Sequence, residues 1–279
     1  MDSLNKYKFF CINVNSLNLS TATRTNNKFE RKLLYILGHK PEFIILQDVR
    51  IGPHKALVER ILNFNNFSNY QAIINSSNDS RGTLIAYKSS LNIKILNTYF
   101  DEDENLIILT IDSGAVIFNL VNIYLGTDAQ NFNTLDLMRA YLENSGTHNI
   151  LIFGDLNNYF DTKDVFYNNP VNDNTFRPPN PANLRKLNFI MSNLELMDVF
   201  RHKNPQAQTF SFKPFGNDNY MSRLDYCLAS PIFKHNCNIE YGPIHSTLFD
   251  HAAVMCEIDT FKKITGIKKL KTTNLTLKV

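Results

Sequence analysis

The amino-acid sequence predicts an α/β fold in which two packed β-sheets are flanked by helices. Short apolar runs rich in Ile, Val, Phe and Tyr recur along the 279 residues, and their length and β-branching favour strands. Segments with the spacing of amphipathic helices lie between them. The runs number about ten, which is too many for one open sheet, so two sheets packed face to face accommodate them better.

The first half of the chain contains one predicted helix among six predicted strands. Several of the runs are apolar throughout, as expected of strands covered on both faces. The helix covers 26–38, because Phe29, Leu33, Leu34 and Leu37 are expected on one face and Gly38 is a usual helix stop. The six predicted strands are residues 8–14, 43–47, 70–75, 83–88, 106–111 and 115–124.

The second half contains two predicted helices and three predicted strands. The helices cover 133–144 and 183–193, and the second follows the Pro-rich stretch RPPNP, since proline suits the first turn of a helix. The strands are residues 149–154, 223–229 and 252–258. No internal repeat or long linker interrupts the pattern. One domain is therefore predicted over 1–260, followed by a Lys-rich tail or linker over 261–279.

Composition indicates an intracellular globular protein. Hydrophobic residues make up 43% of the chain and charged residues 20%. No apolar run approaches the ~18 residues that span a bilayer, so no membrane association is expected. The N-terminus lacks the apolar region of a signal peptide, so secretion is not expected. The four cysteines form no C-x-x-C pair, which favours free thiols, three of them inside strand-like runs, in a reducing compartment.

The net charge of +3 is unevenly distributed. Six lysines and no acid lie in the last 18 residues. Removing those six positive charges from +3 leaves −3 on the rest of the chain. Any nucleic-acid footprint on the body of the protein must therefore be a local patch.

Polar side chains that suit catalysis follow most of the predicted strands. Taken singly, Asp and Asn at strand ends are mostly turn formers, and a lone His is usually structural. Several acids gathered in one neighbourhood are unfavourable unless a cation or hydrogen bonds offset their charge, which points toward a metal. The residues are Asn13, Asn15, Gln47, Asp48, Asn122, Tyr124, Asp155, Asn157, Asp225, Asp250 and His251.

These motifs, in this order, resemble the endonuclease/exonuclease/phosphatase superfamily over roughly residues 7–258. They read INVNSLN, LQDVR, NIY, GDLNN, LMDVFRHKNP with TFSF, SRLDY and FDHAAV. The resemblance implies a four-layered α/β sandwich with two mixed sheets and Mg²⁺-dependent cleavage of phosphodiesters. The segment from MDVFRHKNP to SRLDY looks most like apurinic endonucleases and the endonuclease domains of non-LTR (LINE-type) retrotransposons.

The resemblance also implies a role for each motif residue. Asp48 would bind the metal, with Asn13 and Asp250 completing its surroundings. Asp155 would orient or deprotonate the attacking water, Asn157 would hold that water or the phosphate, and Tyr124 would bind a phosphate oxygen. His251, held by Asp225, would stabilise the negative charge that develops on the phosphate. Independently of the resemblance, a histidine beside a carboxylate, as proposed for His251 and Asp225, is expected to have a raised pKa. Residues 155 and 157 should also face the same side of an extended segment.

Three positions depart from the family pattern. Asp48 replaces the family glutamate and is shorter by one C–C bond, about 1.5 Å. Asn15 stands where apurinic endonucleases tend to have an acid and LINE-type enzymes an asparagine, which favours the retroelement-like reading. Gly126 replaces a proline after Tyr124, which loosens that loop.

Four residues are candidates for contacts with the substrate: Asn15, Arg223, Phe215 and Tyr220. The segment 213–221 has the composition of a hairpin tip. In LINE-type relatives a loop here enters the DNA minor groove, and either aromatic residue could wedge against bases. A solvated hairpin with buried aromatic side chains is an equally good interpretation.

The favoured function is a Mg²⁺-dependent DNA endonuclease, with Mn²⁺ expected to substitute, that nicks one strand and leaves a 3′-hydroxyl for retrotransposition. The expected partners are double-stranded DNA and further domains of a longer polyprotein, such as a reverse transcriptase, with the nucleus as the site of action. One alternative is a phosphodiesterase acting on abasic DNA, RNA or another phosphodiester. A second is a catalytically weak DNA-binding module.

Overall fold

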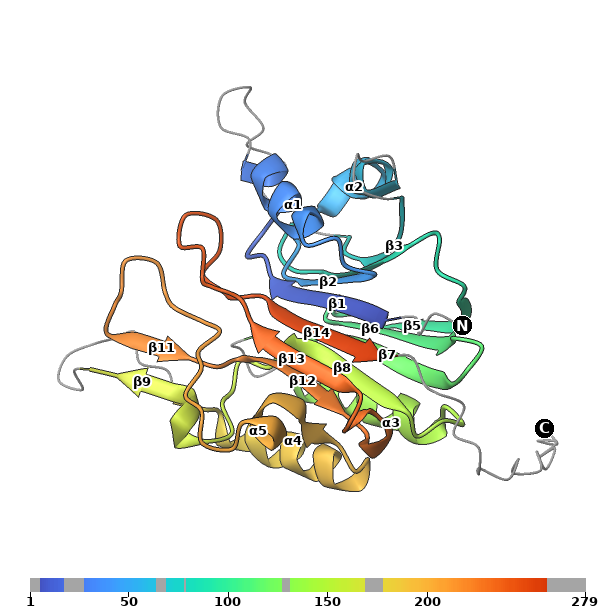
Figure 1. Ribbon diagram of the computed structural model, residues 1–279. Coiled ribbons are helices and arrows are strands. Elements are labelled where there is room, and N and C mark those ends of the chain that lie inside the picture. The colour runs from blue at the N-terminus through green and yellow to red at the C-terminus, as the bar shows by residue number, and fades with distance from the viewer. Residues whose placement is uncertain are drawn as a thin grey trace.

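The computed structural model describes residues 6–17, 28–63, 69–77, 79–126, 131–168 and 178–259. These residues form four layers: helices, a six-stranded sheet, a second six-stranded sheet and further helices (Figure 1). The predicted α/β sandwich is therefore confirmed. None of the described helices combines the length and the apolar character needed to cross a bilayer.

The first sheet has the strand order β13–β14–β1–β2–β4–β3. Strands β1 and β2 are parallel, and the other neighbours are antiparallel. Helices α1 (Lys28–Gly38) and α2 (Lys55–Asn63), with a short 3-10 turn η2 (Gly52–His54), cover its outer face. The strands are β1 (Lys6–Asn13), β2 (Phe43–Gln47), β3 (Tyr70–Asn75), β4 (Thr83–Lys88), β13 (Cys237–Tyr241) and β14 (Val254–Asp259).

The second sheet has the order β10–β12–β8–β7–β6–β5, with β7 and β8 parallel. Helices α3 (Asn131–Asn144) and α4 (Pro181–Asn193) pack on its outer face. The strands are β5 (Lys94–Phe100), β6 (Leu106–Asp112), β7 (Ile117–Tyr124), β8 (Ile150–Asp155), β10 (Met197–Asp198) and β12 (Asp225–Ala229). The remaining elements are β9 (Val165–Tyr167) paired with β11 (Tyr220–Ser222), α5 (Val199–Lys203), η3 (Thr162–Asp164) and η4 (Pro231–Phe233).

Apolar side chains from both sheets fill the space between them. Phe9 stacks on Phe43 and on Phe153, which joins the two sheets by ring contacts. All four cysteines are buried free thiols, as predicted for core residues. Two of the strand-end amides also belong to this interior: Gln47 Nε2 donates to Asn122 Oδ1 at 2.7 Å. Asn122 therefore ties the sheets together and does not face a site.

The nine predicted strands and three predicted helices are present with small shifts at their ends. The elements that the sequence did not predict lie mainly at sheet edges. Strand β5 is largely exposed, and β13 alternates between buried and exposed residues. Helix α2 buries only Val58 and Leu62. An edge element needs few apolar residues, so its sequence pattern is weak.

Candidate active site

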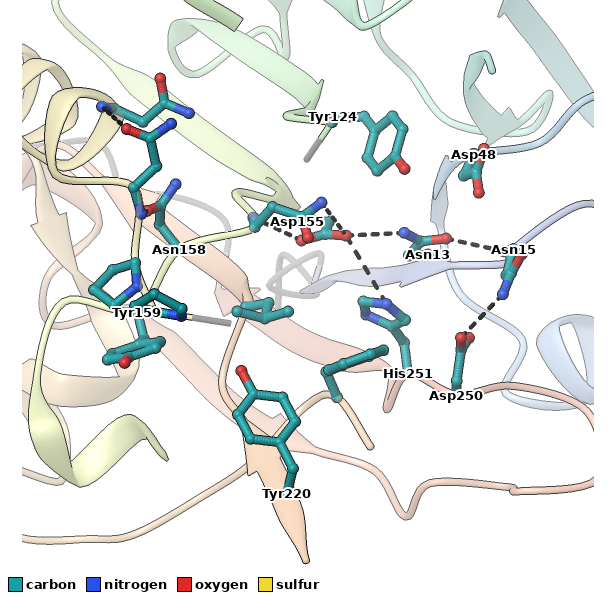
Figure 2. Close-up of a pocket in the computed structure, with 18 of the residues that line it drawn as sticks. Asn13, Asn15, Asp48, Tyr124, Asp155, Asn158, Tyr159, Tyr220, Asp250 and His251 are labelled. Atoms are coloured by element: carbon teal, nitrogen blue, oxygen red, sulfur yellow. Dashed lines mark hydrogen bonds and ion pairs between the residues drawn. The ribbon is translucent and has the colours of Figure 1, made fainter. Parts of the chain in front are cut away.

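The two pairs of parallel strands end at the same edge of the sandwich. Asn13 is aligned with Gln47 at the ends of β1 and β2, and Tyr124 is aligned with Asp155 at the ends of β7 and β8. Because the two sheets pack face to face, Asn13 Nδ2 donates to Asp155 Oδ2 at 2.9 Å across the interface (Figure 2). Polar residues that are far apart in the chain thus meet at one place.

A cavity of about 840 Å³ opens at this edge. Of the twelve residues that were predicted to act in catalysis, metal binding or substrate contact, nine line this cavity. They are Asn13, Asn15, Asp48, Tyr124, Asp155, Asn157, Tyr220, Asp250 and His251.

Asp225 lies behind the cavity and contacts His251 directly. Their Nδ1 and Oδ2 atoms are 2.7 Å apart, and His251 Nε2 lies 3.9 Å from Asp155 Oδ2. Asp225 and Asp155 are aligned partners on β12 and β8, so the imidazole has a carboxylate near each of its nitrogens. This arrangement agrees with the pairing of His251 and Asp225 that the motifs imply.

The charges of these three groups depend on one another. Burial alone would lower the pKa of His251, but the charge and hydrogen bond of Asp225, with the charges of Asp155 and Asp250, raise it to about 10. Burial and the charge of Asp225 raise the pKa of Asp155 to about 7, although His251 and a hydrogen bond from Asn13 oppose the shift. The histidine is therefore a cation at neutral pH, and Asp155 is suited to exchange a proton.

Asp155 and Asn157 are brought together by a turn and not by an extended segment. Asn157 has a φ of 45°, and its backbone N–H donates to Asp155 Oδ1 at 2.8 Å. Its Nδ2 donates to Leu125 O at 2.5 Å and lies 3.3 Å from Asp155 Oδ2. The expectation of extended geometry is wrong here. The two residues form an Asx turn and also line the cavity, so both interpretations of this motif apply.

The opposite wall of the cavity offers oxygen atoms to a cation. Asp48, Asp250 and Asn15 lie together there, and Asn15 Nδ2 donates to Asp250 Oδ2 at 2.9 Å (Figure 2). Asp250 Oδ1 is buried and has no hydrogen-bond partner among the described residues. A buried carboxylate oxygen without a partner, in a cavity that a second carboxylate also lines, fits a divalent ion that prefers oxygen ligands.

Two other groups fit such an ion less well. Asn13 was expected beside the metal, but its Nδ2 donates to Asp155 and its Oδ1 accepts the N–H of Asn15, so its side chain positions the Asp155 carboxylate. Donor atoms of Asp155, Asp225 and His251 lie within 4.8 Å of one another. A protonated histidine is a poor ligand, however, because metal binding requires the neutral imidazole.

Arg223 does not contact substrate, contrary to the prediction. Its side chain is fully buried, and its guanidinium binds Asp164 at 2.8 and 2.9 Å and Asp198 at 2.6 Å. It also lies over the ring of Tyr226, 4.4 Å from the ring centroid. A fully buried guanidinium paired with two carboxylates, of which that of Asp164 is buried as well, is structural, and it anchors the segment that carries Asp225.

The two aromatic residues of the segment 213–221 separate. Tyr220 is buried and faces the cavity, with Phe212 and His251 nearby (Figure 2). Phe215 is 51% exposed at the turn, and Lys28 Nζ from α1 lies 5.7 Å from its ring centroid. Phe215 is therefore the aromatic side chain that an approaching macromolecule can reach.

Several residues that shape the site were not predicted from the sequence. Arg50 binds Asp48, and the buried Lys32 donates to the carbonyls of Val14 and Ser16, holding the loop that carries Asn13 and Asn15. Arg50 stands in the quoted LQDVR motif, two residues after Asp48, so its spacing was available as a signal. Lys32 had no local signal, because its place on a helix resembles any solvated lysine. Other lining residues that were missed are Asn158, Tyr159, Asn180, Asn183, Phe212 and Leu224.

Comparison with known families decides the assignment. The Endonuclease/Exonuclease/phosphatase family model matches residues 12–244, which is most of the chain. The chain belongs to this family. Members of the Endonuclease/Exonuclease/phosphatase family are metal-dependent phosphodiesterases and nucleases, so this chain is a metal-dependent phosphodiesterase. Comparison with curated protein sequences gives no match.

Solved structures with the same fold include three nucleases or phosphatases. The AP endonuclease LMAP from Leishmania major superposes with a TM-score of 0.71 at 18% identity, covering 91% of this chain and 88% of that one. The endonuclease domain of TRAS1, a telomere-specific non-LTR retrotransposon, gives 0.64 at 12% identity, with 92% and 100% coverage. The 3′ phosphatase NExo from Neisseria, bound to a product DNA hairpin, gives 0.67 at 16% identity, with 91% and 99% coverage. At these identities the similarity establishes the fold of this family member.

Proposed function

We propose that this family member is a Mg²⁺-dependent DNA endonuclease that nicks one strand and leaves a 3′-hydroxyl. The observation that carries the proposal is the placement of a proton-exchanging carboxylate and a cationic histidine opposite an oxygen-rich wall in one open cavity. Phosphodiester hydrolysis needs an aligned water, a cation near the departing oxygen and donors around the phosphate oxygens. The cavity has side chains that suit each of these three requirements.

Each side chain has a defined task in this hydrolysis. Asp155, fixed by Asn13 and by the turn at Asn157, accepts a proton from water as the water oxygen attacks phosphorus. The bond from phosphorus to the 3′-oxygen breaks, the departing oxygen takes a proton from solvent water and becomes the 3′-hydroxyl, and the phosphate stays on the 5′ end. His251 donates its N–H to a phosphate oxygen, and Tyr124 is placed to donate its O–H to another. When bound at Asp48, Asp250 and Asn15, Mg²⁺ would neutralise the charge of the departing oxygen.

We further propose that the nick serves retrotransposition in the nucleus, with double-stranded DNA as substrate. Further domains of a longer polyprotein, such as a reverse transcriptase, would use the 3′-hydroxyl. Support comes from Asn15, which stands where LINE-type enzymes tend to have an asparagine, and from the exposed Phe215 on the segment 213–221. Action on abasic DNA is the second candidate, because Phe212, Leu224 and Tyr220 give the cavity an aromatic and apolar wall beside His251.

The decisive experiment is nicking of supercoiled plasmid with Mg²⁺ and with EDTA. Asp155→Ala and His251→Ala should each lower the nicking rate by at least ~10²–10³, because each removes a group that acts in the transition state. Asp136→Ala, which removes a half-exposed carboxylate on α3, is the matched control and should nick at the normal rate. Wild-type rates in either cavity variant would contradict the proposed function.

The product end and the substrate class are read in the same assay. A 3′-hydroxyl allows a DNA polymerase to extend the nicked strand, whereas a 3′-phosphate blocks extension. A duplex with one abasic site, compared with an intact duplex, distinguishes the second candidate. Cleavage confined to the abasic strand would replace the retrotransposition proposal with abasic-site hydrolysis.

A further inference from the structure

The carboxylate that replaces the family glutamate is already paired with a cation. Asp48 Oδ1 accepts from Arg50 Nε at 2.8 Å, and Oδ2 accepts from Arg50 Nη2 at 2.7 Å. Two parallel bonds of this kind form the strongest arrangement between arginine and a carboxylate. Both oxygens of Asp48 are thus engaged, whereas Asp250 has one oxygen without a partner among the described residues.

The pairing is built into the backbone of the loop after β2. Asp48 and Arg50 both have left-handed φ values, 54° and 48°. Hydrogen bonds hold this conformation: Ser16 N donates to Asp48 O, Val49 N to Gly82 O and Arg50 N to Arg81 O, at 2.8 to 3.0 Å. The loop therefore turns both side chains to the same side, toward the cavity that they line.

The solvent exposure of Arg50 allows its guanidinium to leave Asp48 for another anion. The Asp48 side chain is 4% exposed, so its carboxylate stays in the cavity wall, whereas the Arg50 side chain is 38% exposed. A divalent ion bound to Asp48 would lie within a few ångströms of the guanidinium, where two positive charges repel strongly. A phosphate, in contrast, offers the guanidinium an equivalent pair of acceptor oxygens.

We propose that Arg50 is a movable counter-ion that couples divalent-cation binding to phosphate binding. Without DNA, Arg50 is paired with the Asp48 carboxylate, and its positive charge keeps the affinity of Asp48, Asp250 and Asn15 for the divalent cation low. A phosphodiester that enters the cavity binds Arg50, and the carboxylate of Asp48 becomes available to the ion. By linkage, the ion then strengthens the binding of the phosphodiester by the same factor. This inference rests on the proposed function, because it assumes a divalent ion beside Asp48.

Binding of Mn²⁺, followed by the electron paramagnetic resonance signal of the free ion, tests the proposal without any measurement of catalysis. All proteins carry His251→Ala, so that DNA stays intact during the titration. Without DNA, Arg50→Ala should bind Mn²⁺ about tenfold or more tightly than the parent, because a neighbouring positive charge is gone. Arg50→Lys, which keeps the charge but loses the two parallel bonds, should fall between them.

A short duplex supplies the second half of the test. Adding the duplex should tighten Mn²⁺ binding to the parent protein by about the factor that Arg50→Ala gives without DNA. The duplex should change the Mn²⁺ affinity of Arg50→Ala by less than about twofold. Arg81→Ala removes one positive charge from the adjacent segment and should alter Mn²⁺ affinity less than Arg50→Ala does. Circular dichroism establishes that each variant is folded.

Two results would overturn the proposal. One is Mn²⁺ binding to Arg50→Ala that is equal to or weaker than that of the parent, which would make Arg50 a simple support for Asp48. The other is binding of no Mn²⁺ by any of the proteins, with or without DNA. A failure of the proposed function looks different: the expected Mn²⁺ pattern would appear, but the protein without the His251 substitution would not nick DNA.

Discussion

Asp155 and Asp225 lie opposite each other on β8 and β12, both fully buried, with the imidazole of His251 near both carboxylates. Two like charges this close oppose each other's ionisation. The imidazolium relieves that repulsion, and the resulting set holds a proton acceptor next to a hydrogen-bond donor. This division of roles depends on the charge of Asp225, which can be tested alone.

The pH dependence of the nicking rate should reveal the effect of the Asp225 charge on His251. In the wild type, the rate should rise as pH passes about 7, where Asp155 ionises, and fall near pH 10, where His251 loses its proton. Asp225→Asn removes the largest of the charges that raise the pKa of His251, so the opposing effect of burial is less fully offset and the basic limb should move to lower pH by about one unit or more. Single-turnover rates measured across this range check the shift. An unmoved basic limb would mean that Asp225 does not control the protonation of His251.

At the scale of secondary-structure elements, the parallel pair β7 and β8 places Tyr124 beside Asp155. Gly154, the residue directly before Asp155, allows β7 and β8 to pair this closely. A Cβ atom at this position would lie 1.9 Å from the carbonyl oxygen of Ile123. No side chain can be accommodated unless the strands separate.

Gly154→Ala should therefore destabilise the fold by at least about 3 kcal/mol, the upper part of the usual cost of overpacking, because the obstacle is backbone and not a flexible side chain. Urea denaturation followed by circular dichroism measures the free energy of unfolding. Gly38→Ala at the end of α1 is the matched control, since nothing lies within 4 Å of its added Cβ, and its stability should be unchanged or slightly higher. Equal stability of the two variants would contradict this account of β7 and β8.

The segment 213–221 is a second element with a separable task. Shortening it, or replacing Phe215 by Ala, should redistribute the nick sites on a supercoiled plasmid and change the total rate little, because a loop that inserts into a groove senses DNA shape. Mapping the nicked ends by primer extension gives the distribution. Phe189→Ala is the matched control, because Phe189 is a similarly exposed aromatic residue on α4, 54% against 51%. A cleavage pattern identical to that of the wild type would exclude the segment from target choice.

At the scale of the whole molecule, positive charge is concentrated in the predicted tail 261–279, which lies outside the described residues. The six lysines beyond residue 260 account for the positive net charge, while the rest of the chain carries −3 when they are removed from +3. The residues that line the cavity all belong to the described part of the chain, and we expect the lysines to contribute to DNA affinity and not to the chemistry.

A chain ending at residue 260 should keep its melting temperature and its single-turnover nicking rate at saturating DNA. Its DNA affinity should be weaker at low salt. The slope of log K against log salt should become less steep by up to ~5, the value for six lost phosphate contacts at ~0.9 each. Filter binding at several salt concentrations measures the slope. A loss of melting temperature on truncation would contradict the predicted boundary between 1–260 and 261–279.

The fold was predictable from the sequence because its signals are local. Strand β2, for example, is buried along its whole length and begins with the four consecutive apolar residues FIIL, as burial on both faces requires. The outer helices carry the 3.6-residue period of one buried face. The elements that escaped prediction, such as β5 and α2, lie where little apolar surface is covered, and there the local pattern carries little information.

The sequence by itself determined which residue types stand at the ends of the strands, and the order of the motifs determined the family. Only the tertiary structure decided what each polar side chain does. Asn13 and Asp155 are separated by 142 positions in the chain, yet a hydrogen bond joins the Asn13 amide to the Asp155 carboxylate. Arg223 is a neutralised interior residue because Asp164 and Asp198 surround it. The physical reason is that hydrogen bonds and ion pairs act over a few ångströms, between partners that only the packing of the two sheets brings together.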